Sequence, residues 1–291
     1  MKIATLQFAP RLGQRDDNIR HANEILNTKD LSNIDLLVLP ELAFSGYNFP
    51  SLQAITPYLE PTAAGPSTIW AQNTAARLDC HVCIGYPEAC TVEPGTNYNS
   101  QVIVSPVGAV VTHYRKSFLY YTDETWAAEG QGFAAAVIPA FGIFETVVTG
   151  ICMDINPYKF QAAEDAYEFA TYGIQAGARL IVLSTAWLTR LSPAELLDSS
   201  GDEDIDTISY WINRFTPLVE NESGTEEIVV VFANRCGLEP VVGYAGSSCA
   251  MRFANGTIDI WDMLGRAEET VLLIDTEAPP RYSVKRSPWV R

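Results

Sequence analysis

The order of apolar patterns along this chain predicts an α/β fold in which two β-sheets are flanked by helices. Short β-rich apolar runs alternate with longer segments whose apolar residues recur at helical spacing. The run 34–39 is almost entirely apolar, which is typical of strands buried on both faces. The 291 residues are 47% hydrophobic and 19% charged, and no linker or repeat divides them, so we expect one globular domain over 1–291.

The expected elements follow one another in chain order. Apolar residues at helical spacing predict each helix, as Ile19, Ala22 and Ile25 do in the first of them. Pro106-Val107-Gly108 joins two strand-like runs and predicts a hairpin. Strands are expected at 2–8, 34–39, 81–86, 100–105, 109–114, 135–138, 144–151, 179–185, 229–233, 249–253, 257–261 and 270–275, and helices at 16–26, 67–79, 160–176 and 205–220.

Charge and composition limit the partners and the location. The formal net charge of −16 argues against a nucleic-acid partner, because phosphate binding needs a basic surface. The acidic stretch 195–206 predicts an exposed surface insertion, read most simply as a solvated loop. The start of the chain resembles a strand and not a signal peptide, and no apolar run approaches the roughly 20 residues of a membrane helix. We therefore expect a cytoplasmic protein with no membrane partner.

Six cysteines in a chain of this size do not indicate a disulfide framework. Cys80 and Cys83 have Cys-x-x-Cys spacing with His81 between them, so a zinc site is one interpretation. This segment alternates like a strand, however, and successive side chains of a strand point to opposite faces. No second Cys/His pair follows at zinc-site spacing. We expect reduced thiols, no metal and no cofactor.

Three groups with complementary chemistry follow β-rich runs. Glu41 comes after 34–39, Lys116 after 109–114, and Cys152 after 144–151. A carboxylate, an amine and a thiol at matching strand ends can converge in one pocket, where the carboxylate serves as base and the thiol as nucleophile. Taken singly, each residue has a simpler interpretation: two surface charges and one buried thiol.

In this combination the sequence resembles the nitrilase, or carbon–nitrogen hydrolase, superfamily. The resemblance implies an αββα four-layer sandwich of two mixed sheets, often paired into a homodimer, and a Glu41–Lys116–Cys152 triad that needs no cofactor. It runs from the opening strand to about residue 275. The motifs that carry it are Leu39-Pro40-Glu41-Leu42 with Gly46-Tyr47, Tyr114-Arg115-Lys116-Ser117-Phe118-Leu119, Gly150-Ile151-Cys152-Met153-Asp154 and Ala233-Asn234-Arg235.

The residues after the cysteine narrow the resemblance. Most members of the superfamily follow Cys-Tyr-Asp with an Arg-Phe-Pro-Glu-like run, whereas this chain has Ile155-Asn156-Pro157-Tyr158-Lys159-Phe160 after Asp154. That version is similar to the fungal branch whose members deamidate an N-terminal Asn or Gln of peptides. The resemblance thus implies peptide or protein N-termini as the substrate.

The chemistry of the triad assigns roles. Glu41 takes the thiol proton, the Cys152 thiolate attacks the amide carbon, and Lys116 with the backbone N–H of Met153 stabilises the oxyanion. A thioester forms as ammonia leaves, and water activated by Glu41 hydrolyses it. The family's second glutamate is expected at Glu124, which would orient Lys116 or the substrate amide, with Glu129 as the competing choice.

A peptide N-terminus also requires a group that holds its α-ammonium. We expect a carboxylate near the nucleophile to do so, and the candidates are Asp154, Asp123 and Glu129. Asp154 has an equally good interpretation as a turn-capping residue bonded to local N–H groups. The other expected substrate contacts are Trp126 and Trp187, as pocket walls, together with Met153 and Tyr47.

Two other functions remain open at this point. The same triad serves small-molecule amidases, carbamoylases and nitrilases. A chain that kept the fold but lost activity would be a scaffold or binding protein, although all three triad residues are present.

Overall fold

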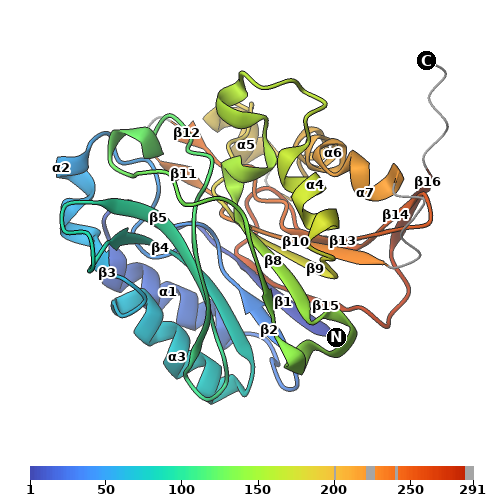
Figure 1. The fold of residues 1–291 in the computed structure, drawn as a ribbon, viewed down its shortest axis with the longest axis horizontal. Helices are drawn as coiled ribbons and strands as arrows, with labels where there is room; N and C mark the ends of the chain where they lie inside the picture. The colour runs from blue at the N-terminus through green and yellow to red at the C-terminus, as the bar shows by residue number, and fades with distance from the viewer. Residues whose placement is uncertain (200, 221–226, 240–241, 286–291) are drawn as a thin grey trace.

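Two seven-stranded β-sheets stack face to face, with helices on both outer faces, in a computed structural model of the chain (Figure 1). The structure describes residues 1–291 apart from 200, 221–226, 240–241 and 286–291. This four-layer arrangement confirms the expected αββα sandwich of two mixed sheets.

The first sheet has the strand order β15-β1-β2-β4-β5-β6, with β3 paired to β4. β1, β2 and β4 run parallel, so that β1 Ile3 pairs with Leu36 and Leu36 with His81. β5 and β6 then form antiparallel pairs, which leaves β6 running in the same direction as β2. The strands are β1 (Lys2–Gln7), β2 (Leu36–Val38), β3 (Glu60–Pro61), β4 (His81–Ala89), β5 (Asn97–Val104), β6 (Val110–Arg115) and β15 (Thr270–Asp275).

The second sheet has the order β16-β14-β13-β10-β9-β8-β7. β8, β9 and β10 are parallel, and their flanking strands are antiparallel. The strands are β7 (Ala134–Val137), β8 (Thr146–Ile151), β9 (Leu180–Thr185), β10 (Ile228–Asn234), β13 (Cys249–Ala254), β14 (Thr257–Met263) and β16 (Tyr282–Lys285). β11 (Leu238–Glu239) and β12 (Val242–Gly243) form a separate two-stranded sheet.

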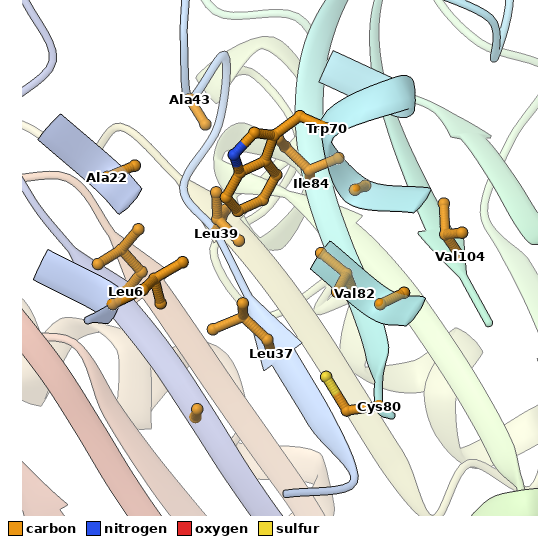
Figure 2. Close-up of a cluster of buried hydrophobic side chains, with 14 of the residues drawn as sticks. Leu6, Ala22, Leu37, Leu39, Ala43, Trp70, Cys80, Val82, Ile84 and Val104 are labelled. Atoms are coloured by element: carbon orange, nitrogen blue, oxygen red, sulfur yellow. The ribbon is translucent and has the colours of Figure 1, made fainter. Parts of the chain in front are cut away.

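Helices α1 (Arg15–Leu26) and α3 (Pro66–Leu78) cover the outer face of the first sheet (Figure 1). Figure 2 shows this layer, in which Ala22 and Trp70 pack over sheet residues such as Leu37. The other outer face is covered by α4 (Glu168–Gln175), α6 (Ile205–Arg214) and α7 (Thr216–Glu220). Two further helices, α2 (Leu52–Ile55) and α5 (Pro193–Asp198), lie in connections.

The innermost core lies between the two sheets. Ile3, Leu36 and Val38 of the first sheet pack in one cluster with residues of the second. Cys83 belongs to this inner cluster, whereas Cys80 belongs to the outer one, so the two thiols lie on opposite sides of the first sheet. Across the described residues there is no group of three or more His, Cys, Asp or Glu side chains placed to hold a metal ion.

Two predicted helices differ from the structure. A short 3-10 helix, Tyr158–Phe160, ends where the predicted helix should begin, the segment 161–167 is not helical, and α4 begins only at Glu168; Phe160 and Tyr167 have left-handed backbone angles. The predicted helix 205–220 is split into α6 and α7 at Phe215. In the acidic stretch 195–206, part of α5 and the start of α6 replace the expected loop, and Asp204 is buried. None of the helices in the described ranges is long and apolar enough to cross a membrane.

Candidate active site

Glu41 lies three residues beyond the end of β2 and packs against β4. Gly85 on β4 allows this, because a Cβ atom there would lie 2.9 Å from the Glu41 Cα atom. The main chain is then held by the Ala43 N–H, which donates to the Gly85 carbonyl at 3.1 Å. The Glu41 side chain is 1% exposed, and its Oε2 atom accepts a hydrogen bond from the Ala186 N–H at 2.9 Å.

Lys116 follows β6 and is fully buried. Its Nζ atom lies 2.6 Å from Glu41 Oε1 and 2.6 Å from Asp123 Oδ2. Burial alone would lower the pKa of the Lys116 ammonium, but the carboxylates of Asp123 and Glu41 outweigh it and raise the pKa. The side chain therefore stays cationic and supplies a fixed positive charge in a site that excludes water.

Cys152 stands at a strained elbow at the end of β8. Its φ angle is 42°, in the left-handed region that non-glycine residues rarely adopt. The strand can approach the helix layer here because Gly150 has no side chain; a Cβ atom there would lie 2.6 Å from the Phe169 ring. Such strain at a strand end is common at functional sites, where it aims a side chain.

The surroundings of Cys152 disfavour the thiolate form of its side chain. Burial, followed by the Glu41 carboxylate, raises the pKa of the Cys152 thiol well above its ordinary value, against the effect of Lys116 and the Ala186 N–H. The resting group is then a thiol, and any reaction through its sulfur would need a proton acceptor. Burial also raises the pKa of Glu41, which brings the carboxylate nearer to the basicity of a useful general base.

Asp154 braces the elbow and does not face the cavity. Its Oδ1 atom accepts from the N–H groups of Ser117 (3.0 Å) and Phe118 (2.8 Å), and its Oδ2 atom from the Ile151 N–H (2.8 Å) and the Tyr114 hydroxyl (2.9 Å). Burial raises the pKa of Asp154 to about 6 in spite of these bonds. The expectation that Asp154 holds a substrate ammonium is wrong, because its acceptors already bind the residues around Lys116 and Cys152; its capping interpretation holds.

A cavity of about 720 Å³ opens onto Cys152. Tyr47, Met153 and Trp187, all expected as substrate contacts, line it. Further lining residues were not predicted; they include Tyr120, Asn156, Phe160, Ala186, Leu188, Thr189, Arg190, Leu191, Asp204, Asp206, Thr207, Ser209, Tyr210, Asn213 and Arg266. Its volume is within the range of about 300–1,000 Å³ typical of small-ligand sites.

The second carboxylate of the site is Asp123, not Glu124 or Glu129. A one-turn 3-10 helix, Asp123–Thr125, directs residue 123 inward and leaves Glu124 exposed. Glu129 is also exposed and accepts a hydrogen bond from the Tyr158 hydroxyl at 2.9 Å. The assignment of Glu124, with Glu129 as competitor, is therefore corrected: adjacent acidic residues in a loop cannot be separated without the turn geometry.

The other expected contacts are also placed by the structure. Asp123 is buried behind the cavity and accepts hydrogen bonds from Lys116, so it does not present a free carboxylate to a ligand. Trp126 packs with Tyr47 and Ala186 in a cluster beside the site but does not line the cavity. Trp187 lines the cavity and contacts Tyr210, with ring centroids 5.6 Å apart.

Two asparagines whose roles the sequence did not predict hold Glu41 and its neighbours in place. Asn99 on β5 donates from Nδ2 to Glu41 and to Asp123. Asn234, at the end of β10, accepts from the Trp187 N–H at 2.8 Å and so fixes the loop that carries Ala186. Asn99 could have been suspected, because 97, 99 and 101 place amide side chains on one face of a strand otherwise rich in apolar residues.

The order and geometry of these groups define a class of enzyme. The sequence model of the family described as carbon-nitrogen hydrolase matches residues 2–156, more than half of the chain, and the chain belongs to this family. It is accordingly a hydrolase that acts on carbon–nitrogen bonds other than peptide bonds.

Within this family the chain is similar to proteins of two yeasts. It is 35% identical to the protein N-terminal amidase of Schizosaccharomyces pombe over 294 residues. This alignment covers 95% of this chain and 100% of that protein. The protein N-terminal amidase of Saccharomyces cerevisiae is 33% identical over 211 residues, covering 66% of this chain and 46% of that protein. A crystal structure of N-terminal amidase with an Asn-Glu-Ala peptide has the same fold, with a TM-score of 0.83 at 22% identity over 98% of this chain and 99% of that chain.

Proposed function

We propose that this chain deamidates the N-terminal Asn or Gln of peptides and proteins, which yields Asp or Glu and releases ammonia. The observation that carries this substrate is the 35% identity over the full length of the S. pombe protein N-terminal amidase. Solved structures of N-terminal amidase, similar to this chain in fold, hold Gln-Val and Asn-Glu-Ala peptides. The geometry around Cys152 supports the chemistry.

In the first half-reaction Glu41 takes the proton of the Cys152 thiol, and the sulfur attacks the side-chain amide carbon of the substrate. Negative charge develops on the amide oxygen, where Lys116 and the Met153 N–H stabilise it. Glu41 returns the proton to the leaving nitrogen, and ammonia departs from a thioester on Cys152. The Ala186 N–H faces both the thiol and the Glu41 carboxylate, so it couples the two reacting groups.

In the second half-reaction Glu41 takes a proton from water, and the resulting hydroxide attacks the thioester carbon. The carbon–sulfur bond breaks, Cys152 regains its proton, and the carboxylic acid product leaves. Overall one water molecule is consumed and one ammonia released. Asp123 keeps Lys116 oriented through both steps, since its Oδ2 atom accepts from the ammonium at 2.6 Å.

The cavity supports a peptide as the occupant. Its carboxylate-bearing residues are Asp204 and Asp206, and Asp204 is 5% exposed. Asp204 already accepts hydrogen bonds from the Thr207 N–H and the Thr189 hydroxyl, so the exposed Asp206 replaces Asp154, Asp123 and Glu129 as the carboxylate available to a substrate α-ammonium. Apolar and aromatic walls at Tyr120, Phe160 and Trp187 suit the remaining peptide. A cytoplasmic location is part of this proposal, and the six unpaired, buried cysteines support it.

The direct test is mass spectrometry of a small peptide panel with the purified protein. Asn- and Gln-initiated peptides should gain the mass of deamidation, while their N-acetylated forms and internal Asn and Gln should not react. Acetylation removes the cation that Asp206 would hold. Turnover of acetylated peptides at the rate of free ones, or reaction of free small amides alone, would replace the proposal with a general amidase.

Two cysteine variants serve as controls for the nucleophile. Cys152→Ser should abolish turnover while the protein remains folded, because a hydroxyl is a far weaker nucleophile than a thiolate at neutral pH. Cys90→Ser, at a buried thiol outside the cavity, should retain it. Appreciable turnover by Cys152→Ser would show that the thioester mechanism is wrong.

A further inference from the structure

A closed ring of hydrogen bonds joins four buried side chains behind Cys152. On one side the Lys116 ammonium lies 2.6 Å from both Glu41 Oε1 and Asp123 Oδ2. On the other side the Nδ2 atom of Asn99 lies 2.7 Å from Glu41 Oε1 and 3.1 Å from Asp123 Oδ1. Asn99 is thus a second bridge between the two carboxylates, and it carries no charge.

The orientation of the Asn99 amide follows from its neighbours. Ionised carboxylates only accept hydrogen bonds, so the NH₂ end must face them. The Oδ1 atom at the other end has no hydrogen-bond partner in the part of the chain that the structure describes. An orphaned buried acceptor disfavours folding, and its presence here shows that the contacts to Glu41 and Asp123 determine how the side chain sits.

The main chain of Asn99 also holds Lys116. Its carbonyl oxygen accepts from the Lys116 N–H at 2.8 Å, directly beyond the last β5–β6 pair. One residue therefore fixes the base of the Lys116 side chain by its backbone and the partners of the ammonium by its amide. A shift of Asn99 would move all three charged groups of the ring.

The number of charges around Glu41 explains why the second bridge between the two carboxylates is a neutral amide. The charged and titratable groups that face Glu41 are Lys116, Asp123 and Cys152, with the hydroxyls of Tyr47 and Tyr244 farther away. One ammonium thus serves two carboxylates. Burial raises the pKa of Glu41, and the Asn99 hydrogen bond is among the contacts that oppose this rise.

We infer that Asn99 is a positioning residue of the proposed reaction, which holds Glu41 and Asp123 at a fixed spacing around Lys116 and keeps Glu41 ionised to accept the Cys152 proton. The inference rests on the proposed function for the role of Glu41 as base. It does not depend on which amide is the substrate, since no atom of Asn99 lines the cavity.

The test uses the reactivity of Cys152 itself. The rate of its alkylation by iodoacetamide is measured against pH, with the modified peptide identified by mass spectrometry, for wild type, Asn99→Ala and Asn99→Asp. Loss of the hydrogen bond in Asn99→Ala should move the acid limb of the profile upward by about one pH unit. Asn99→Asp, which keeps the shape and adds a third carboxylate, should move it further in the same direction.

Gln101→Ala is the matched control. Gln101 is an equally buried amide two residues along β5, but its Nε2 atom donates to Ser184 at 2.7 Å and not to the ring. Its removal should lower the melting temperature without moving the acid limb. A wild-type acid limb in both Asn99 variants, or an equal shift in Gln101→Ala, would overturn the inference. If Asn99→Ala does not fold, the isosteric Asn99→Asp is used alone, and an acid limb at the wild-type pH in that variant overturns the inference.

The same measurement separates this inference from the proposed function. Alkylation needs no substrate, so the shift is observable even if no N-terminal peptide reacts. A shifted profile without turnover of any peptide would overturn the proposed substrate and support the role of Asn99. Peptide turnover by wild type, combined with an acid limb that does not move in the Asn99 variants, would support the proposed substrate and overturn the role of Asn99.

Discussion

At the scale of single residues, the charge around Lys116 is set by which carboxylates the turn after it directs inward. Asp123 Oδ2 accepts from Lys116 and from the Tyr120 N–H, and the Tyr47 hydroxyl lies 3.4 Å away. A neighbouring carboxylate only one residue later points to solvent. Substitutions at Asp123 and at Glu124 can therefore be compared to distinguish a role in the site from a general effect of acidic charge.

We expect Asp123→Asn to lower kcat/KM by about 100-fold, the scale of a small misplacement of a catalytic group. The amide keeps the shape but gives the ammonium a weaker partner, so Lys116 is less firmly held. Glu124→Gln removes the same charge from an exposed position and should leave kcat/KM within about twofold of wild type, since exposed charges contribute little. Steady-state rates with a Gln-initiated peptide measure both, and the reverse ranking would restore Glu124 to the site.

At the scale of elements, the loop after β6 and the elbow after β8 are joined by one carboxylate. Asp154 binds N–H groups of Ser117, Phe118 and Ile151, and through them it fixes Lys116 relative to Cys152. Each oxygen has two donors. An amide has only one oxygen, so Asn at this position would turn N–H groups toward two of those donors.

Asp154→Asn should therefore reduce the free energy of unfolding by about 3–5 kcal/mol, because it leaves buried donors without acceptors. Urea denaturation followed by tryptophan fluorescence measures this. Asp165→Asn, the same charge change at an exposed position, should remain within about 0.5 kcal/mol of wild type. Equal denaturation midpoints for Asp154→Asn and wild type would show that the elbow does not depend on these bonds.

Elements were predictable from the sequence where one periodicity dominates. Strand β10 carries a long apolar run, and Ala22, Ile25 and Leu26 of α1 recur on one buried face of the helix. The start of α4 was not predictable, because left-handed angles at Lys159, Phe160 and Tyr167 override a helix-like apolar spacing. The expected positions of Glu41, Lys116 and Cys152 came from strand ends; β2 and β6 belong to the first sheet and β8 to the second, and the packing of the two sheets brings these ends together.

The supporting residues were harder to predict for a different reason. Asp123 and Asn99 act through contacts made across the sheet and across a turn, and their neighbours in sequence have the same chemical types. Asp204 sits in a stretch whose composition predicts a solvated loop, yet its Oδ2 atom accepts from the Thr189 hydroxyl at 2.8 Å beside the cavity. Only the packing of the two sheets distinguishes these residues from their neighbours.

At the scale of the whole molecule, the buried ion pair on the first sheet makes stability depend on pH. Glu88 is fully buried and accepts from Arg115, His113, Ser100 and Thr62. Burial alone would raise the pKa of Glu88, but hydrogen bonds from His113 and Arg115 outweigh it and hold the pKa well below its usual range. The stability from this carboxylate is present above the unfolded-state pKa of about 4.3 and is lost as pH falls toward the folded-state pKa.

Glu88→Gln should accordingly be less stable than wild type by about 3 kcal/mol near pH 7, since it leaves the half-buried Arg115 without its charge partner. The difference should shrink steadily below about pH 4, where the wild-type carboxyl is itself increasingly protonated in the unfolded chain. Urea denaturation of both proteins across this range measures it. A difference that stays constant with pH would show that the charge of Glu88 does not stabilise the fold.

The placement of the reacting groups on two different sheets has a consequence for biosynthesis. The base and the ammonium come from the first sheet, whereas the thiol and the Ala186 N–H come from the second. A nascent chain that has emerged from the ribosome only as far as β7 holds Glu41 and Lys116 but not Cys152, and one that ends before residue 186 lacks the N–H that faces Glu41 and Cys152. In the proposed mechanism, hydrolysis therefore begins only when synthesis has passed this point and the two sheets have docked.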